Sequence, residues 1–253
     1  MRATSKNTTG NPASRIAVRS LLTRVLAVLL SALLATAALP AEIQSAKTEK
    51  PRALPTPYKA YGSSSAPITM EVFTDYQCPR CRQFYDQTLR PMIQDYVASG
   101  KVYLIHHDFP LQMHKYSGEA ARWANACAEV GQFEAAETAL YDNQESWGTD
   151  GNVAKFIAAA IPASDFKRVQ EILKGGAMPG PQALDYSADP MTKDVHPCPV
   201  DPFIVSDIKL GYSVPVPGTP TFVITYKRHT LQPMAIAVSW PLLKQLFDNL
   251  LRQ

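Results

Sequence analysis

The stretch Ile68-Thr-Met-Glu-Val-Phe-Thr-Asp-Tyr-Gln-Cys-Pro-Arg-Cys81 decides the fold of this 253-residue chain. Its first part, Ile68 to Phe73, is rich in β-branched and apolar residues and predicts a strand, and Thr74 to Gln77 predict a short turn. A helix is expected from Arg80 to Ala98, because apolar residues recur there at nearly helical spacing and Gly100 follows them. The two cysteines therefore stand where a strand gives way to a helix.

A second strand is predicted from Lys101 to His106, so that strand, helix and strand follow one another within about forty residues. This order is typical of a βαβ unit and predicts a parallel pair of strands inside a sheet. The next hundred residues differ, because apolar residues recur at intervals of three and four. Helices are expected at 116–128, at 133–141 and, as one or two elements, at 153–173.

The rest of the chain is expected to return to the sheet. A stretch with six prolines, from Gly175 to Pro202, predicts a long loop, and a short helix should follow from Phe203 to Leu210. Two strands at 221–226 and 231–238 predict a hairpin, and an amphipathic helix from Pro241 to Leu251 closes the chain. We therefore predict an α/β protein with a core formed by residues 66–110 and 211–253 and a helical insert formed by residues 111–210.

The first 41 residues have the order of a secretory signal peptide. A basic, polar segment precedes the apolar run Val25 to Leu39, which is too short for the hydrocarbon core of about 30 Å that a membrane-spanning helix must cross. A cleaved signal peptide is therefore favoured over a membrane anchor, with small residues offering two cleavage sites near residues 37 and 41. Residues 42–65 lack periodicity and contain three prolines, so a linker is predicted there. Export would place the cysteines in a compartment where disulfides persist.

The charge of the chain speaks against nucleic acid as a partner. The chain has 25 Lys and Arg residues against 22 Asp and Glu, but five of the cations and none of the acids lie in residues 1–41. The remainder has 20 cations against 22 acids, a net charge of −2. Such a body lacks the cationic surface that phosphate binding requires.

The motif Cys78-Pro79-Arg80-Cys81 has a spacing that suits redox chemistry. Two cysteines three residues apart on a helical turn share one face, within the narrow distance range that a disulfide tolerates. The N-terminal end of the helix favours an anion, so Cys78 is expected to ionise readily, and Arg80 adds a cation nearby. Cys81 is expected to be less exposed, to have the higher pKa and to attack a mixed disulfide formed on Cys78.

Two other interpretations of this motif remain open, namely a purely structural disulfide and half of a zinc site. The zinc interpretation requires a second pair of ligands. The other cysteines, Cys127 and Cys198, are single residues, and the pair His196-x-Cys198 does not have a usual zinc spacing.

The sequence at this point resembles the DsbA-like thioredoxin-fold oxidoreductases. The resemblance rests on Phe73-Thr-Asp-Tyr-Gln-Cys-Pro-Arg-Cys81, on Ala126-Cys-Ala128 within the expected insert, and on Val216-Pro-Gly-Thr-Pro-Thr-Phe222. It implies an α/β thioredoxin fold with an inserted helical domain. It also implies that Cys78 is the nucleophile, Cys81 the resolving cysteine and Pro220 a cis-proline that packs against the disulfide. The backbone of Thr219 would then offer hydrogen bonds to a substrate strand.

The sequence departs from this family at two positions. The family often carries a buried acid six residues before the first cysteine, but Val72 stands there, and alternation along the strand turns Glu71 to the other face. Proton transfer to and from Cys81 would then use water or another group. Arg80 stands where histidine is frequent, and arginine keeps the charge but cannot titrate.

The remaining cysteines and histidines receive different interpretations. Cys127 and Cys198 are predicted to form a structural disulfide outside the redox cycle, with free buried thiols as the alternative. His106, His107 and His114 are interpreted as surface residues or as core residues with satisfied hydrogen bonds.

These observations predict an exported thiol:disulfide oxidoreductase that forms disulfides in exported proteins. The alternatives are an extracytoplasmic reductase or isomerase, and a non-catalytic binding or chaperone module on a thioredoxin scaffold. No metal or organic cofactor is expected. The expected partners are cysteine-containing exported proteins and a membrane-bound redox partner that reoxidises Cys78 and Cys81, and the protein is expected to be a periplasmic or otherwise extracytoplasmic monomer.

Overall fold

The computed structural model describes residues 59–174, 198–235 and 238–253. The expected signal peptide, most of the expected linker and most of the proline-rich loop lie outside these residues. Within the described ranges, no helix has the length and apolar character needed to cross a membrane.

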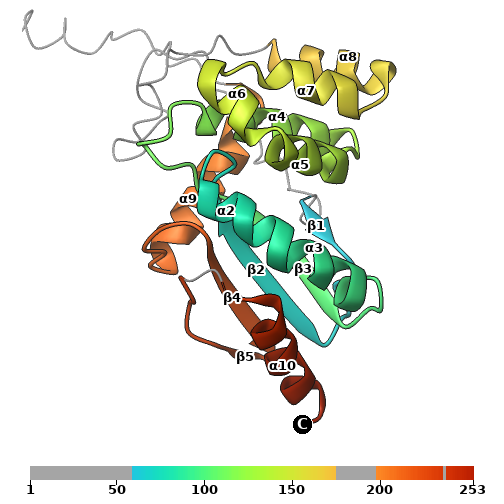
Figure 1. Cartoon of the computed structure of the whole chain (residues 1–253), viewed down its shortest axis with the longest axis vertical. Coiled ribbons are helices and arrows are strands. Elements are labelled where there is room, and N and C mark those ends of the chain that lie inside the picture. The colour runs from blue at the N-terminus through green and yellow to red at the C-terminus, as the bar shows by residue number, and fades with distance from the viewer. Residues whose placement is uncertain (1–58, 175–197, 236–237) are drawn as a thin grey trace, which may run out of the picture. The chain divides into compact units, whose positions relative to one another are not determined.

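A five-stranded sheet with the order β1-β3-β2-β4-β5 forms the centre of the described structure (Figure 1). Its strands are β1 (Ala60–Tyr61), β2 (Ile68–Thr74), β3 (Val102–Asp108), β4 (Thr221–Tyr226) and β5 (His229–Thr230). Strands β2 and β3 run parallel, as the βαβ interpretation predicts, and β4 runs antiparallel to β2. The side chains of Ile68, Met70 and Val72 on β2 are completely buried, which explains the apolar character of this central strand.

The helix expected after the first cysteine extends from residue 79 to residue 97. It comprises α2 (Pro79–Phe84), a π-helical segment η2 (Tyr85–Leu89), α3 (Arg90–Met92) and a second π-helical segment η3 (Ile93–Val97). The residues that join these segments keep helical backbone angles, so the chain forms one continuous helix.

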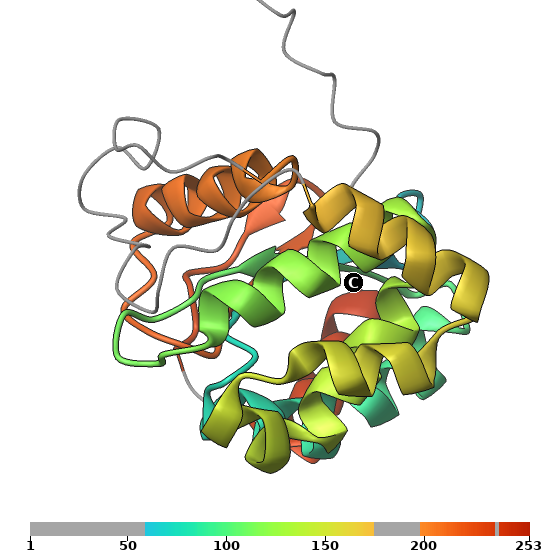
Figure 2. The same cartoon turned by 90° about the horizontal axis from the view of Figure 1, so that it is seen from above.

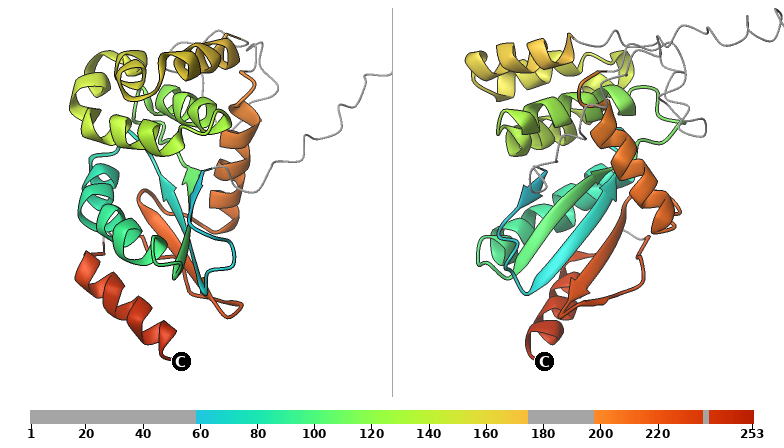
Figure 3. Two further views of the ribbon diagram at one scale, coloured as in Figure 1. Left: turned by 90° about the vertical axis from the view of Figure 1, so that its right-hand side faces the viewer. Right: turned by 180° about the vertical axis from the view of Figure 1, so that it is seen from behind.

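Helices cover both faces of the sheet. The long helix and α10 (Trp240–Leu251) lie on one face, and α9 (Asp201–Ser213) lies on the other (Figure 3). Gly211 allows α9 to approach closely, because a Cβ atom at this position would lie 2.5 Å from the ring of Phe109.

The inserted helices form a separate layer at one end of the sheet (Figures 1 and 2). They are α4 (Ser117–Glu129), α5 (Phe133–Asp142), α6 (Gln144–Asp150), α7 (Val153–Ala160) and α8 (Ala163–Leu173). The predicted helical insert is confirmed, although α6 was not expected from the sequence. Helix α4 packs against both α8 and α9, so the insert is continuous with the α9 side of the sheet.

Three boundaries differ from those predicted. The linker expected to reach residue 65 ends earlier, because Ala60 pairs with Ile105 in strand β1 and Lys59 is buried. A two-residue strand has no periodicity by which a sequence could reveal it. Helix α9 begins at Asp201, before the expected start at Phe203, and packs on both β3 and α4.

The expected C-terminal hairpin is also shorter than predicted. Strand β5 contains only His229 and Thr230, and a single bridge joins Phe222 to Met234 further along the same segment. Residues 236 and 237, within the predicted second strand, lie outside the described residues.

Candidate active site

Cys78 lies at the start of α2, immediately beyond the turn that follows β2. It is the N-cap residue, and its carbonyl oxygen accepts hydrogen bonds from the backbone N–H groups of Cys81 and Arg82 at 3.0 and 3.2 Å. Pro79 occupies the first helical position, where its missing N–H has no helical partner to lose. The strand-to-helix transition predicted from the sequence therefore places Cys78 at the positive end of the helix.

The loop before β4 reaches the thiol of Cys78. The Sγ atom of Cys78 lies 3.6 Å from the carbonyl oxygen of Thr219, and the Thr219–Pro220 peptide bond is cis, as expected. Among the described residues, the buried Oγ1 atom of Thr219 has no hydrogen-bond partner. The structure thus brings Thr219 and Pro220 to the CPRC motif from a segment about 140 residues away in the chain.

The two thiols have opposite pKa shifts. The pKa of Cys78 falls from 9.0 to about 6, chiefly because Cys81 donates a hydrogen bond to it, while partial burial opposes the shift. Thr219 and the backbone N–H groups of Arg80 and Cys81 lower the pKa further. Burial raises the pKa of Cys81 well above 9.0, and the Cys78 sulfur adds to this effect. Cys81 has no exposed surface and Cys78 is 5% exposed, so the order of exposure expected from the sequence is confirmed.

Arg80 acts on Cys78 by a different route from the one that the sequence suggested. Its side chain is exposed, and its backbone N–H is the part that lowers the pKa of Cys78. A contribution from its guanidinium charge stays a prediction.

Asp75, which the sequence analysis did not single out, lies beneath both cysteines. Its backbone N–H donates to the Sγ atom of Cys81 at 3.5 Å, and its carbonyl oxygen accepts from the N–H of Cys78 at 3.0 Å. Its completely buried carboxylate is 2.7 Å from the Nδ1 atom of His114. No local pattern predicts this contact, because Asp75 and His114 are 39 residues apart and both lie outside regular strands and helices.

The helical insert holds the cysteine loop in place. The Gln144 side chain of α6 donates hydrogen bonds to the carbonyl oxygens of Tyr76 and Cys78 at 2.6 and 3.0 Å. Gln77 donates to the carbonyl oxygen of Gly148 at 3.0 Å. Because α6 was not expected from the sequence, these hydrogen bonds between the insert and the cysteine loop were not predicted either.

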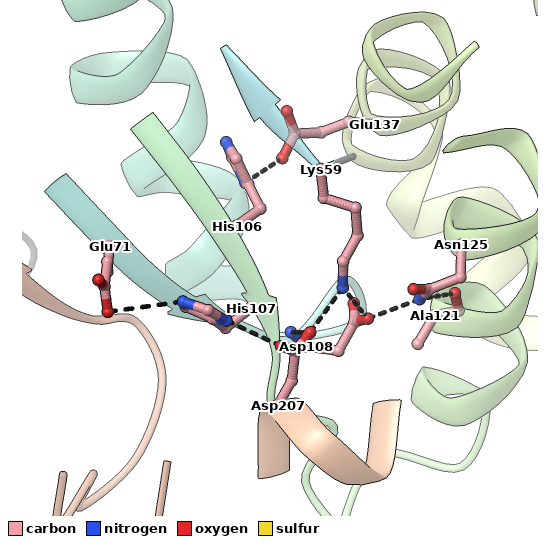
Figure 4. Close-up of polar contacts among 9 residues, drawn as sticks. All are labelled: Lys59, Glu71, His106, His107, Asp108, Ala121, Asn125, Glu137 and Asp207. Carbon is pink, nitrogen blue, oxygen red and sulfur yellow. Dashed lines mark hydrogen bonds and ion pairs between the residues drawn. The ribbon is translucent and has the colours of Figure 1, made fainter. Parts of the chain in front are cut away.

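The face of the sheet beneath Val72 carries other ionisable groups in place of the absent acid. His106 is paired with Val72 in the parallel register of β2 and β3, so both side chains lie on the same face. The Nδ1 atom of His106 is 2.8 Å from the carboxylate of Glu137, which comes from α5 (Figure 4). His106 is thus a buried histidine beside a carboxylate, but neither of its ring nitrogens makes a hydrogen bond among the described residues, so the expectation of satisfied hydrogen bonds is not met.

Cys127 and Cys198 are both buried thiols in the structure, as are Cys78 and Cys81. Burial raises the pKa of Cys127 to about 12 and also raises that of Cys198, so neither thiol is suited to attack. Pairing of these two cysteines upon oxidation stays a prediction. Within the described part of the chain, no group of three His, Cys, Asp or Glu side chains is arranged to hold a metal ion.

Comparisons with known proteins agree with this architecture. The model of the family described as Thioredoxin matches residues 55–235. A probable disulfide bond formation protein D from Bacillus cereus is 27% identical over 121 residues, which cover 46% of this chain and 56% of that protein. The match therefore spans about half the length of this curated relative.

Solved structures show the same fold. Alpha-DsbA1 from Wolbachia pipientis superposes with a TM-score of 0.57 at 20% identity, covering 78% of this chain and 93% of that chain. A thioredoxin-like oxidoreductase from Silicibacter pomeroyi gives a TM-score of 0.51 at 20% identity, with coverage of 78% and 95%. The chain therefore belongs to the thioredoxin family, with a DsbA-like thioredoxin fold that carries a helical insert.

Proposed function

We propose that this protein is a thiol:disulfide oxidoreductase whose redox site is Cys78-Pro79-Arg80-Cys81. The observation that carries the proposal is the opposite shift of the two pKa values, with a Cys78 thiolate favoured at neutral pH and Cys81 held as a buried thiol. Cys78 is the attacked and attacking sulfur, and Cys81 is the resolving one. Thr219 and Pro220 form the loop that faces the substrate.

The reaction is a pair of thiol–disulfide exchanges. A substrate thiolate attacks the Cys78 sulfur, the Cys78–Cys81 bond breaks, and Cys81 leaves as a thiolate that takes up a proton. A second substrate thiolate attacks the substrate sulfur of the mixed disulfide and releases Cys78 as a thiolate. Two electrons pass from the substrate to the cysteine pair, and the substrate gains one disulfide.

Formation of disulfides is the favoured direction. A low pKa at Cys78 stabilises the dithiol form relative to the disulfide, which makes the disulfide the stronger oxidant. A reduction potential less negative than about −200 mV is expected, on the oxidising side of typical glutaredoxins. A value near about −270 mV, that of thioredoxin, would assign the protein to reductases instead.

The substrates we propose are cysteine-containing exported proteins. The signal-like segment at residues 1–41 supports an extracytoplasmic location, and the similarity to the Bacillus cereus protein, a probable disulfide bond formation protein, supports the direction of the reaction. A membrane-bound partner would reoxidise Cys78 and Cys81, and the protein would act as a monomer without a cofactor.

A structural disulfide between Cys127 and Cys198 is a separate part of the proposal. Cys127 lies on α4, and the segment of Cys198 is attached to α4 through a bidentate pair between Arg122 and Asp201, at 2.6 and 2.7 Å. The N–H of Cys198 donates to the same Asp201 carboxylate at 2.9 Å. Digestion of the oxidised protein followed by mass spectrometry should identify a Cys127–Cys198 peptide, and an unlinked Cys198 would contradict the pairing.

The activity is tested with a dithiol peptide as substrate. The oxidised protein should form the peptide disulfide stoichiometrically. With the disulfide form of the same peptide, the Cys78 thiolate of reduced Cys81→Ser should attack one peptide sulfur, release the other as a thiolate and stay trapped as the mixed disulfide, whereas reduced Cys78→Ser should trap none. Cys127→Ser serves as the control for loss of a cysteine outside the redox site and should retain activity. Equal trapping by the Cys78→Ser and Cys81→Ser variants would show that the roles are assigned wrongly, and no oxidation by any form would favour a binding module.

A further inference from the structure

The carboxylate of Asp75, in the turn before the redox cysteines, has four polar partners. It accepts hydrogen bonds from the backbone N–H groups of Gln77 and Leu111 at 2.7 and 2.8 Å and from the hydroxyl of Ser117. His114 contacts the same carboxylate through Nδ1 at 2.7 Å. Because Asp75 has no exposed side-chain surface, its charge is screened by protein groups rather than by water.

The position of this charge matters because the backbone of Asp75 is bonded to both cysteines. A second negative charge forming on Cys78 would be repelled by an uncompensated carboxylate on a residue whose backbone contacts both cysteines. His114 is 17% exposed at its side chain and is the cationic group within salt-bridge distance of Asp75. Its imidazolium form would neutralise the negative charge of the carboxylate, so that a thiolate could form on Cys78 without net repulsion.

We propose that Asp75 and His114 form a positioning pair for the redox site, in which the carboxylate holds an imidazolium beside Cys78 and the imidazolium stabilises the Cys78 thiolate. This inference rests on the proposed function, because it concerns the nucleophile of that reaction. His114 neither attacks the substrate nor transfers a proton in this scheme. It keeps its proton, and its charge acts on the Cys78 sulfur.

The electrostatics of the site agree with this arrangement. The hydrogen bond to Asp75 raises the pKa of His114, partial burial opposes the shift, and the Cys78 sulfur raises it further. The latter effect is reciprocal, so a charged His114 lowers the pKa of Cys78 in addition to the hydrogen bonds from Cys81, Thr219 and the backbone, which are the larger causes. The other ionisable groups that face the cluster are Cys81 on α2 and Tyr141 on α5, and burial raises the pKa of Tyr141 so that it stays neutral.

Three variants separate a charge effect from a structural one. His114→Gln leaves the Asp75 carboxylate without its counter-charge, and the thiolate fraction of Cys78 at pH 5, below its pKa, should fall about tenfold, which is one pKa unit. Asp75→Asn combined with His114→Gln removes both charges and should restore most of that loss. Ser117→Ala removes an uncharged donor from the same carboxylate and should change the thiolate fraction less than about twofold.

The thiolate fraction is measured from the pH dependence of Cys78 alkylation in the reduced protein, with the modified peptide identified by mass spectrometry. A profile that is unchanged in His114→Gln would overturn the proposal. An equal shift in His114→Gln and in the double variant would also overturn it, because only the loss of packing would then explain the change.

A second measurement uses the unmodified protein and so does not depend on the folding of any variant. NMR titration of His114 should give a higher pKa in the dithiol protein than in the protein with the Cys78–Cys81 disulfide, since only the former carries a thiolate. The same pKa in both forms would contradict the proposal. Equilibration with glutathione separates failure of this inference from failure of the proposed function. If Cys78 and Cys81 are reversibly oxidised and reduced but the His114 pKa does not respond, only this inference is contradicted. If the two cysteines are never oxidised to a disulfide, the proposed function is contradicted.

Discussion

Two buried clusters of this protein each pair a histidine with an aspartate, yet they stand in different chemical settings. In the redox cluster, His114 pairs with Asp75, whose backbone is bonded to both reactive cysteines. In the second cluster, which we call the sheet clamp, Lys59, Asp108, Asp207 and His107 join the β1–β3 edge of the sheet to α9 (Figure 4). Similar residue pairs therefore stand at two kinds of site. In one the charges lie near reactive cysteines, and in the other the charges join secondary-structure elements.

The sheet clamp is a network of buried ions with several shared partners. Lys59 contacts Asp108, and it lies 2.7 Å from Asp207, which in turn is 2.8 Å from Nδ1 of His107. Asn125 of α4 donates to Asp108 at 2.6 Å, so the clamp also reaches the insert. The pKa values of Lys59, His107 and Asp207 are shifted by burial and by neighbouring charges and hydrogen bonds within this part of the sheet, whereas Cys78 contributes to the shift at His114. The comparison predicts that the clamp controls stability and the redox cluster controls reactivity.

The largest expected effect is on stability, in the variant Lys59→Met. It leaves Asp108 and Asp207 without their shared cation, and breaking a buried ion pair in this way costs about 3–5 kcal/mol. Denaturant unfolding of the oxidised protein measures the loss, and Lys101→Met, which changes an exposed lysine, is the control. The alkylation profile of Cys78 should stay the same, and a shifted profile would show that the two clusters are not independent.

A smaller effect is expected from pH, through His107. Burial lowers the pKa of His107, but Asp207 and Glu71 outweigh it and raise the pKa from 6.5 to about 9. A raised pKa contributes stability that is complete below pH 6.5 and is lost as pH rises through 9, by up to about 3 kcal/mol for a shift of this size. The oxidised protein should be titrated, because Cys78 then carries no thiol proton, and His107→Gln should flatten the dependence. An identical slope in His107→Gln would assign the loss to another group.

The contact between Gln144 of the insert and the redox site is expected to contribute less to stability than the sheet clamp and more than the surface ion pairs. Gln144→Ala removes the donor that Tyr76 and Cys78 share. The carbonyl oxygen of Cys78 keeps its bonds from Cys81 and Arg82, so the cost of about 1–3 kcal/mol comes from the carbonyl oxygen of Tyr76. Unlike the clamp variant, it should also change the Cys78 alkylation profile, since its partner is the backbone of Cys78. Gln83→Ala, on the exposed side of α2, is a suitable control. A change in stability without any change in the alkylation profile would show that Gln144, like the residues of the sheet clamp, contributes to stability and not to the reactivity of Cys78.

The smallest effect is expected at the surface of the redox site. Arg82 and Glu145 form an ion pair at 2.7 Å, but Glu145 is 87% exposed. Exposed pairs of this kind contribute less than about 1 kcal/mol, so Arg82→Gln should leave both unfolding and alkylation nearly unchanged. A large loss in either measurement would mean that surface charge near Cys78 matters more than the buried pair of Asp75 and His114.

The sequence predicts those parts of the molecule that follow from local pattern. Strand β2, the long helix after Cys78, the parallel neighbour β3 and the helical insert all have a periodicity or a junction that a reader of the sequence can find. The cysteine motif is also local, because its two residues share one helical turn. The cis peptide at Thr219–Pro220 was predicted only because the family resemblance changed the interpretation of an ordinary loop proline.

The missed residues depend on contacts between distant segments. Asp75 reads as a turn residue and His114 as a surface or core histidine until the chain brings them within 2.7 Å. Lys59 lay in an expected linker, and its burial follows from pairing of β1 with β3, which no pattern in two residues can signal. Alternation turned Glu71 away from the face beneath the redox site, as predicted, and it lies 3.6 Å from Nε2 of His107 in the sheet clamp (Figure 4).

The central claim is that Cys78 is a thiolate at neutral pH, and its pH profile tests this most directly. The fully reduced protein is alkylated over a range of pH, and the rate at Cys78 is followed by peptide mass spectrometry, with Cys81 left in place because it donates the hydrogen bond that lowers the Cys78 pKa most. The account predicts a half-maximal rate near pH 6 and no competing reaction at Cys81. A half-maximal rate near about 8.5, the value of an ordinary cysteine, would contradict it.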